Sequence, residues 1–500
     1  MGIIKKQAIG FSIVNYLGVA VGSLSTIFLY PRDEEAYGLF RFLLDSANLI
    51  QPFAMLGAWY VGTRMFSIFK DDKNQHNGLW VLLTLLFFLG STIFAISFSC
   101  LQPLLFPLDR LKDQAIFERY IWTIVPLFIL FGYFVLARNY ASNFLKVVVP
   151  SFFDQLIKIS FPIIFILYLT GLLNLDGLVA GVLLHFLLMV FLSLGYLRKI
   201  NALHWKIPKR NFLSKSQWRS LVGFALYGAI GSGSSMIALR LDTFMISMLM
   251  GDLHDTGRFS IASLIGSNIA VPFSAITAIS APIIAKAWNE NNLEEISRLY
   301  QKSSENLLWI GLLLFGLVIL CIEDLFLIMP GGRHDYSAEI AVVYIVGCKS
   351  VIDMATGAND TIIAYSKKYG FNLIAIVFMS VLNVLGNLML IPLFGIMGAA
   401  LSTFVSSLCF NLLKFLFIRQ QFKLMPYTVN TLKILLICIF FTGLCLFIPR
   451  LDSPYFSMII RGCVFLFLAI GCSLYFDVSE DITYMKQQFK GKIKTILFKS

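Results

Sequence analysis

The sequence carries charged side chains inside long apolar stretches, where charges are costly. On membrane-insertion scales a charge near the bilayer centre costs about 2.5–3.5 kcal/mol, so each such residue is expected to have a partner or a function. Opposite charges four residues apart lie on one face of a helix, close enough to neutralise each other. The pairs with this spacing are Arg41 with Asp45, Asp154 with Lys158 and Lys349 with Asp353, and the remaining charges of the set are Arg240, Asp242 and Asp360.

The cations of this set indicate a binding site for an anion. Buried cations that face a shared cavity suit a group such as a diphosphate, because Arg offers a bidentate fork and Lys a point charge. We expect Arg41, Arg240 and Lys349 to contact the substrate. Moving each of them by about 219 residues, the repeat spacing described below, lands on an uncharged residue, so these cations are not scaffold residues common to both repeats.

The carboxylates allow two interpretations. Asp45, Asp353 and Asp360 serve either in ion coupling or in neutralising nearby cations. The same two interpretations hold for Asp154 and Lys158, which lie near a predicted helix end where a long side chain reaches the interface at low cost.

Motifs of catalytic chemistry are absent from the sequence. It has no nucleophile, phosphate-loop, dinucleotide or zinc signature, its 8 cysteines form no CxxC pair, and its 5 histidines lack metal-site spacing. For His185, which lies within an apolar stretch, hydrogen-bonded packing is favoured over a proton relay. We therefore predict no catalytic residue, no metal site and no cofactor. A transporter without an ATP site would have to run on an ion gradient, on the substrate gradient or on downstream consumption of the product.

The composition indicates that these residues are carried by membrane-spanning helices. The 500 residues are 58% hydrophobic and 14% charged, with a mean hydropathy of +0.79. A spanning helix needs about 20 apolar residues, and the continuous apolar runs do not fit the alternation of membrane strands. We predict an all-α integral membrane protein of about fourteen spans: 7–30, 38–63, 79–100, 118–138, 147–169, 174–196, 218–250, 258–285, 303–328, 338–363, 368–391, 395–417, 430–448 and 456–475. Three glycines in the run 218–250 favour a tilted or locally broken helix.

The chain carries a duplicated pattern with a spacing of about 219 residues. Gly38 and Pro52 have counterparts at Gly257 and Pro272, and the apolar runs recur in the same order. Two parallel halves are typical of rocking transporters with a substrate site between the halves. We predict an N-terminal six-helix bundle at 1–197, a basic linker at 198–217, a second six-helix bundle at 218–418, an extra helix pair at 429–475 and a basic tail at 476–500.

The net charge of +12 follows the membrane topology. Lys and Arg are concentrated on the side that carries both predicted termini, so the positive-inside rule places both termini in the cytoplasm. The basic linker 198–217 is then a topology signal beside anionic lipid, and we predict no nucleic-acid partner. The tail 476–500 fits either a short helix on the cytoplasmic leaflet or a solvated segment.

Three motifs carry a resemblance to a known family. They are Pro31–Leu39 (PRDEEAYGL), Leu241–Met245 (LDTFM) and Pro392–Ala400 (PLFGIMGAA). In this order and spacing the sequence resembles polysaccharide or oligosaccharide-lipid flippases, the polysaccharide transporter family, of the multidrug/oligosaccharidyl-lipid/polysaccharide exporter superfamily. The resemblance covers nearly the whole chain. Among the charged candidates it includes only Asp242, which it adds to the expected substrate-binding residues.

The resemblance implies a V-shaped bundle that works by alternating access. Its substrate would be a polyprenyl-diphosphate-linked oligosaccharide, moved from the cytoplasmic to the outer leaflet of the bacterial inner membrane for surface polysaccharide export. The expected partners are this lipid-linked oligosaccharide, the lipid bilayer and polysaccharide assembly proteins, and the protein is expected to be a monomer.

Two other functions compete with this one. An ion-coupled multidrug exporter of the same fold is the first alternative, although its cavity is expected to be acidic or aromatic, and here cations accompany the carboxylates. An integral-membrane glycosyltransferase or polymerase is the second, but such an enzyme normally needs catalytic carboxylates on a large outer loop. The predicted loops are too short to hold a catalytic domain.

Overall fold

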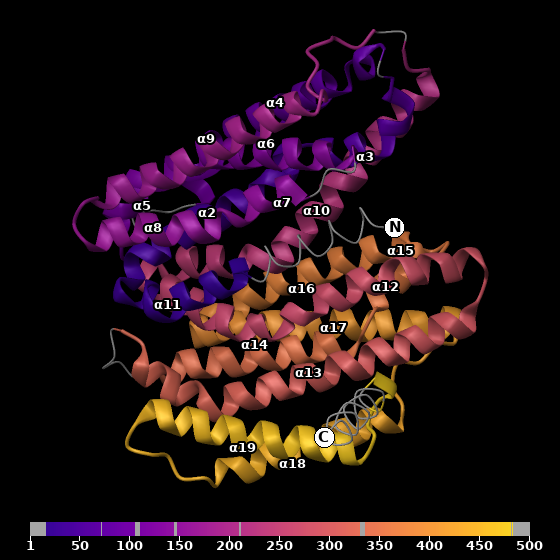
Figure 1. The fold of residues 1–500 in the computed structure, drawn as a ribbon. Helices are drawn as coiled ribbons and strands as arrows, with labels where there is room; N and C mark the ends of the chain where they lie inside the picture. The colour runs from indigo at the N-terminus through magenta and orange to yellow at the C-terminus, as the bar shows by residue number, and fades with distance from the viewer. Residues whose placement is uncertain are drawn as a thin grey trace, which may run out of the picture. The chain divides into compact units, whose positions relative to one another are not determined.

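The computed structural model describes residues 17–71, 73–105, 111–144, 148–209, 212–330, 336–481 and 483. The chain divides into two compact units, Met1–Ile261 and Ala262–Ser500. The described residues form helices and contain no strand (Figure 1). The expected all-α fold class is therefore confirmed.

The first unit contains a helix at residues 17–28 followed by a series of helices up to α11, which runs past the unit's end. These are η1 (Tyr30–Arg32), α2 (Glu34–Ala54), α3 (Ala58–Phe69), η2 (Gln75–Gly78), α4 (Leu79–Leu105), α5 (Gln114–Tyr120), η4 (Ile121–Thr123), α6 (Ile124–Ser142), α7 (Val148–Gln155), α8 (Ile157–Leu169), α9 (Leu175–Lys199), α10 (Lys215–Met250) and α11 (Leu253–Ser267). The second unit continues with η5 (Asn268–Ala270), α12 (Val271–Asn289), α13 (Leu293–Ile328), α14 (Ser337–Ala355), α15 (Asn359–Tyr365), α16 (Gly370–Phe394), α17 (Ile396–Phe422), α18 (Val429–Leu446) and α19 (Pro454–Tyr475).

Many of these helices have the length and composition of membrane spans. Among the described residues 11 helices qualify, or up to 12 if the bent pair α14 and α15 is one span. The chain is thus a multi-pass membrane protein. The count of about fourteen spans stays a prediction, since residues 7–16 of the first predicted span lie outside the described residues and α2 and α3 do not qualify.

The predicted span 38–63 is divided in the structure. Helix α2 ends at Ala54 and α3 begins at Ala58, with Leu56 and Gly57 both at positive φ, 46° and 67°. A side chain at Gly57 would overlap the backbone of Ala225 in α10. Glycine is therefore required here for two reasons, because it adopts the positive φ without strain and because it leaves room for the backbone of α10. The break changes the direction of the chain beside α10.

Helix α10 is continuous over 36 residues, so of the two expected alternatives, a tilted or a locally broken helix, the local break is wrong. Its glycines have a packing role instead. A Cβ at Gly228 would overlap the Tyr60 side chain of α3, and one at Gly233 would overlap the Phe53 ring of α2. Small residues at these positions therefore let α2 and α3 pack closely against α10.

Helices α2 and α11 cross at two glycines that the repeat makes equivalent. A Cβ at Gly38 would overlap the carbonyl group of Leu253, and one at Gly257 would overlap the carbonyl oxygen of Glu34. Reciprocal contact between equivalent positions is what a two-fold relation produces. The duplication itself stays a prediction.

In the second unit, the last two long helices pack against α13. Figure 1 shows α18 and α19 side by side with it. The Arg461 Nη1 atom of α19 lies 3.8 Å from Asp324 Oδ2 of α13, and Ser457 donates to the same oxygen at 2.7 Å. Both charged side chains are almost completely buried. A buried polar cluster thus joins α19, the second helix of the predicted extra pair, to α13.

Candidate functional site

In the first unit, α2 and α10 bring together three of the predicted site residues. Arg41 and Asp45 lie one turn apart on α2, with Arg41 Nη2 donating to Asp45 Oδ2 at 2.7 Å. Arg240 of α10 reaches the other carboxylate oxygen, with its Nη1 3.5 Å from Asp45 Oδ1. The Arg41–Asp45 pair predicted from spacing is therefore present, and Arg240 joins it as a tertiary contact.

The start of α2 fixes where this cluster lies. Asp33 caps the helix by accepting from the Ala36 N–H at 2.9 Å, and the Tyr168 hydroxyl of α8 donates to the other Asp33 oxygen at 2.8 Å. The Tyr37 ring stacks on Tyr30 with 4.3 Å between centroids. The cap and the aromatic packing hold the first two turns of α2, and Arg41 and Asp45 follow directly.

The cluster has one more positive charge than negative charge, and two of its donors have no acceptor. The Asp45 side chain is 0% exposed, that of Arg41 15% and that of Arg240 39%. Among the described residues, Nε of Arg41 and Nε of Arg240 are buried and lack a hydrogen-bond partner. A buried donor without an acceptor costs free energy. An anion with several oxygens would satisfy both donors and balance the excess charge.

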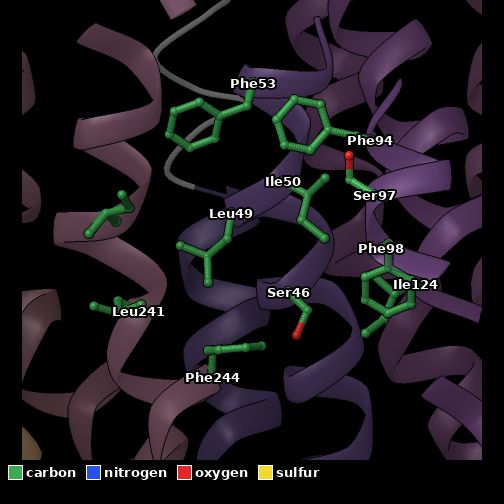
Figure 2. Close-up of a pocket in the computed structure, with 11 residues that line it drawn as sticks. Ser46, Leu49, Ile50, Phe53, Phe94, Ser97, Phe98, Ile124, Leu241 and Phe244 are labelled. Atoms are coloured by element: carbon green, nitrogen blue, oxygen red, sulfur yellow. The ribbon is translucent and has the colours of Figure 1, made fainter. Parts of the chain in front are cut away.

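An apolar cavity of about 290 Å³ lies between α2, α4 and α10 (Figure 2). Ser46 and Leu241, the chain neighbours of Asp45 and Arg240, belong to its wall. The full lining consists of Ser46, Leu49, Ile50, Phe53, Phe94, Ser97, Phe98, Ile124, Ile237, Leu241 and Phe244. A cationic cluster and an apolar cavity thus adjoin within one unit.

In the second unit, Asp353 is the centre of a polar network between α14 and α17. Its Oδ2 lies 2.9 Å from Lys349 Nζ, which confirms the predicted pair. Its Oδ1 accepts from Ser407 Oγ and from Asn411 Nδ2, both at 2.6 Å. Both oxygens of the Asp353 carboxylate therefore have partners, a cation at one and two neutral donors at the other.

A second ion pair lies where α14 and α15 meet at a bend of 47°. The buried Lys414 ammonium of α17 pairs with Asp360 at the start of α15 and stands 3.8 Å from the centroid of the Phe410 ring. Lys414 lies in the predicted span 395–417 but was not among the predicted site residues. The spacing rule for helix pairs does not reach Asp360, because 54 residues separate the two in sequence.

The remaining candidates are distributed over the first unit. Asp154 of α7 forms its ion pair with Arg138 of α6 at 2.6 Å. The Lys158 stem lies beside Gly18, and Asp242 lies half-buried on α10 two residues beyond Arg240. His185 makes a 2.8 Å hydrogen bond with Ser160 of α8, in keeping with a packing role. Within the described residues no group of three or more His, Cys, Asp or Glu is placed to hold a metal ion.

No protein-family model matches the chain, and no curated protein matches it in sequence. Solved structures do match. Lipid II flippase MurJ in an inward closed conformation aligns with a TM-score of 0.74 at 13% identity, covering 94% of this chain and 98% of the flippase. An inward-facing multidrug resistance MATE transporter of the MOP superfamily aligns with a TM-score of 0.62 at 14% identity, covering 83% and 94%. The MATE multidrug transporter DinF-BH aligns with a TM-score of 0.58 at 16% identity, covering 84% and 95%.

These similarities establish the fold. The chain has the all-helical fold of the lipid II flippase and of the MATE transporters. The resemblance inferred from the three sequence motifs is therefore confirmed at the level of the fold.

Proposed function

We propose that this protein is a flippase for a polyprenyl-diphosphate-linked oligosaccharide. It moves the lipid from the cytoplasmic to the outer leaflet of a bacterial inner membrane by alternating access, for surface polysaccharide export, and it is not an enzyme. The observation that carries this proposal is the Arg41–Asp45–Arg240 cluster, with its excess positive charge and its two buried Nε–H donors without acceptors.

The chemistry of the cluster suits a diphosphate better than a cationic drug. A diphosphate supplies several acceptor oxygens to two guanidinium groups, and charge-assisted hydrogen bonds of this kind are the strong ones. A cationic ligand would meet an excess of like charge at Arg41 and Arg240, because Asp45 neutralises only one of them. The extent of the match to the lipid II flippase, 94% of this chain, is in keeping with a lipid-linked substrate.

The proposal includes the remaining predicted features. Lys349 and Asp242 join Arg41 and Arg240 as substrate contacts, and Asp45, Asp154, Lys158, Asp353 and Asp360 take part in ion coupling or charge pairing. The chain has about fourteen spans in two parallel repeats plus a helix pair, with both termini in the cytoplasm. The contact between Gly38 and Gly257 supports this repeat. The protein acts as a monomer in contact with polysaccharide assembly proteins.

Translocation in liposomes tests the proposal. Purified protein is reconstituted with a fluorescent lipid-diphosphate sugar, and the fraction reached by an external quencher is followed over time. We expect Arg240→Ala to slow translocation by about tenfold or more, because it removes charge-assisted hydrogen bonds worth about 1.5–3 kcal/mol. Arg240→Lys should fall in between, since it keeps the charge and loses the fork.

The matched control is Arg119→Ala, which removes an arginine from an exposed ion pair with Asp176 in the same unit. Its rate should equal that of the wild type. Equal rates for the wild type, Arg240→Ala and Arg41→Ala would contradict the cationic head-group site, and absence of translocation by the wild type would contradict the flippase function itself.

A second candidate function is ion-coupled multidrug export. The carboxylates Asp353 and Asp360 beside the bend of α14 and α15 favour it, because helix breaks in transporters are places where coupling ions bind. The same liposomes distinguish the two functions. Uptake of a cationic dye that depends on a sodium or proton gradient, together with no movement of the lipid-linked sugar, would support the exporter.

A further inference from the structure

The cavity between α2, α4 and α10 has an almost entirely apolar wall. Leucine, isoleucine and phenylalanine side chains form most of it, and Ser46 and Ser97 are the only polar residues in its wall among those that the structure describes. Figure 2 shows Ser46 and Phe244 toward one end of the cavity, and Phe53 and Phe94 toward the other. Along α2 this distance is seven residues, roughly 10 Å at 1.5 Å per residue. The cavity is therefore elongated along the helices.

Helix register connects this cavity to the cationic cluster. On α10, Ile237 precedes Arg240 by three residues and Phe244 follows it by four, so all three lie on one face. On α2, Leu49 follows Asp45 by four residues in the same way. Because Ile237, Phe244 and Leu49 line the cavity, the cluster and the cavity occupy the same faces of two helices that pack together.

The junction between the two regions leaves polar groups without partners. Within the described residues, Ser46 Oγ is buried at the cavity end next to Asp45 and has no hydrogen-bond partner. Arg240 Nε, next in the chain to Leu241, is also buried and also has no hydrogen-bond partner among the described residues. A ligand with oxygen atoms at this end and a hydrocarbon chain in the cavity would satisfy these groups and cover the apolar wall.

We propose that this cavity binds the head-proximal part of the polyisoprenoid tail of a polyprenyl phosphate or diphosphate, with its phosphate at Arg240. The inference rests on the proposed function and adds to it the place where the tail enters the protein. A terminal phosphate or diphosphate carries more charge and more free acceptor oxygens than the phosphodiester of an ordinary phospholipid, so it matches two guanidinium groups better. Each buried methylene group strengthens binding about fourfold.

Binding of defined lipids to the full chain tests the tail site. The probes are a long-chain polyprenyl phosphate, inorganic pyrophosphate and phosphatidylglycerol, each titrated in detergent by native mass spectrometry. Ile237→Trp and Leu49→Trp fill the cavity, and Leu239→Trp is the control because its side chain is 64% exposed on α10. We expect the two filling variants to bind polyprenyl phosphate at least about tenfold more weakly than the wild type. Pyrophosphate binding and the Leu239→Trp variant should be unchanged.

Crosslinking covers the case in which a filling variant does not fold. A polyprenyl phosphate with a diazirine on its first isoprene units is photolysed with the wild-type protein, and the modified peptides are identified. Labelling of α2, α4 or α10 at the cavity supports the site, and labelling only elsewhere overturns it. Unchanged affinity for polyprenyl phosphate in both filling variants, when both are folded, also overturns the tail site. So does the finding that phosphatidylglycerol competes for the site as well as polyprenyl phosphate itself.

The outcome for the tail site is separable from the outcome for the flippase. Translocation of the lipid-linked sugar by the wild type with crosslinks outside the cavity would refute the tail site and leave the function intact. Crosslinks in the cavity without any translocation would refute the function and leave a lipid-binding site.

Discussion

Gly38 of α2 and Gly257 of α11 face each other so closely that neither position has room for a side chain. A Cβ atom on Gly38 would overlap the backbone of Leu253 and would lie 3.0 Å from the Gly257 nitrogen. The obstacle is backbone, which cannot rotate away as a side chain can. The two helices would have to separate to accept even a methyl group.

We therefore expect Gly38→Ala to destabilise the first unit by about 1–3 kcal/mol, the usual cost of overpacking. The readout is the thermal unfolding midpoint in detergent, followed by size-exclusion fluorescence. Gly195→Ala on α9 is the control, since nothing lies within 4 Å of the added Cβ atom. A midpoint for Gly38→Ala equal to or above that of the control would show that the crossing is loose.

Removal of Asp45 should cost more stability than removal of either arginine that it contacts. Asp45→Ala leaves Arg41 and Arg240 close together without a counter-charge, and breaking a buried ion pair in this way typically costs about 3–5 kcal/mol. The expected result is a large loss of thermal stability, partly restored by the double variant Asp45→Ala/Arg41→Met. Asp176→Ala removes a carboxylate that is 45% exposed and should change little. An unaltered midpoint for Asp45→Ala would contradict the pairing.

The Lys414–Asp360 pair should respond asymmetrically to substitution. Lys414 is 0% exposed and Asp360 52% exposed. Asp360→Asn strands a buried ammonium and should cost about 3–5 kcal/mol, whereas Lys414→Met leaves a carboxylate that water can reach and should cost much less. Chemical unfolding of the two single variants and of the double variant measures the difference. Equal losses of unfolding free energy in the two single variants would contradict the expected asymmetry.

The turn between α10 and α11 should stay closed over a wide pH range. Lys112 pairs with Asp252 at 2.5 Å, and the Leu253 N–H donates to Asp113 Oδ2 at 2.7 Å. Burial by itself raises the pKa of Asp252, but the hydrogen bonds from Lys112 and from the His254 N–H outweigh burial and hold this pKa below its ordinary value. The hydrogen bond to Asp252 raises the pKa of Lys112.

The contribution of Asp252 to stability is therefore present above the ordinary carboxyl pKa and is lost only as the pH falls through the lowered value. The contribution of Lys112 is present below the ordinary lysine pKa and is lost as the pH rises through the raised value. Amide hydrogen exchange of Leu253, corrected for its intrinsic rate, should thus show constant protection from about pH 5 to about pH 9. Lys112→Ala is the comparison, and a drop in wild-type protection near pH 6 would contradict the assignment.

The sequence predicted those parts of the structure that depend on local spacing. Every predicted span contains helix in its described residues, because apolar runs of sufficient length leave the backbone no other way to satisfy its hydrogen bonds in lipid. The pairs Arg41–Asp45 and Lys349–Asp353 were also predictable, since four residues make one helical turn.

The contacts that were not predicted join different helices. Arg240 meets Asp45, and Lys414 meets Asp360, only because separate helices pack together. The apolar cavity was missed for the same reason, since residues of α2, α4 and α10 line it jointly. The local break in α10, one of the two alternatives expected for this helix, was wrong because glycine serves two purposes in membrane helices. At Gly228 and Gly233 it admits neighbouring aromatic rings, and the helix continues.

Helix α17 bridges the bend between α14 and α15. Asn411 of α17 binds Asp353 before the bend, and Lys414, one turn further along α17, binds Asp360 after it. Helix α17 thus spans the bend, with one polar contact to α14 and one to α15. Straightening or further bending at this point would therefore have to break one of these contacts.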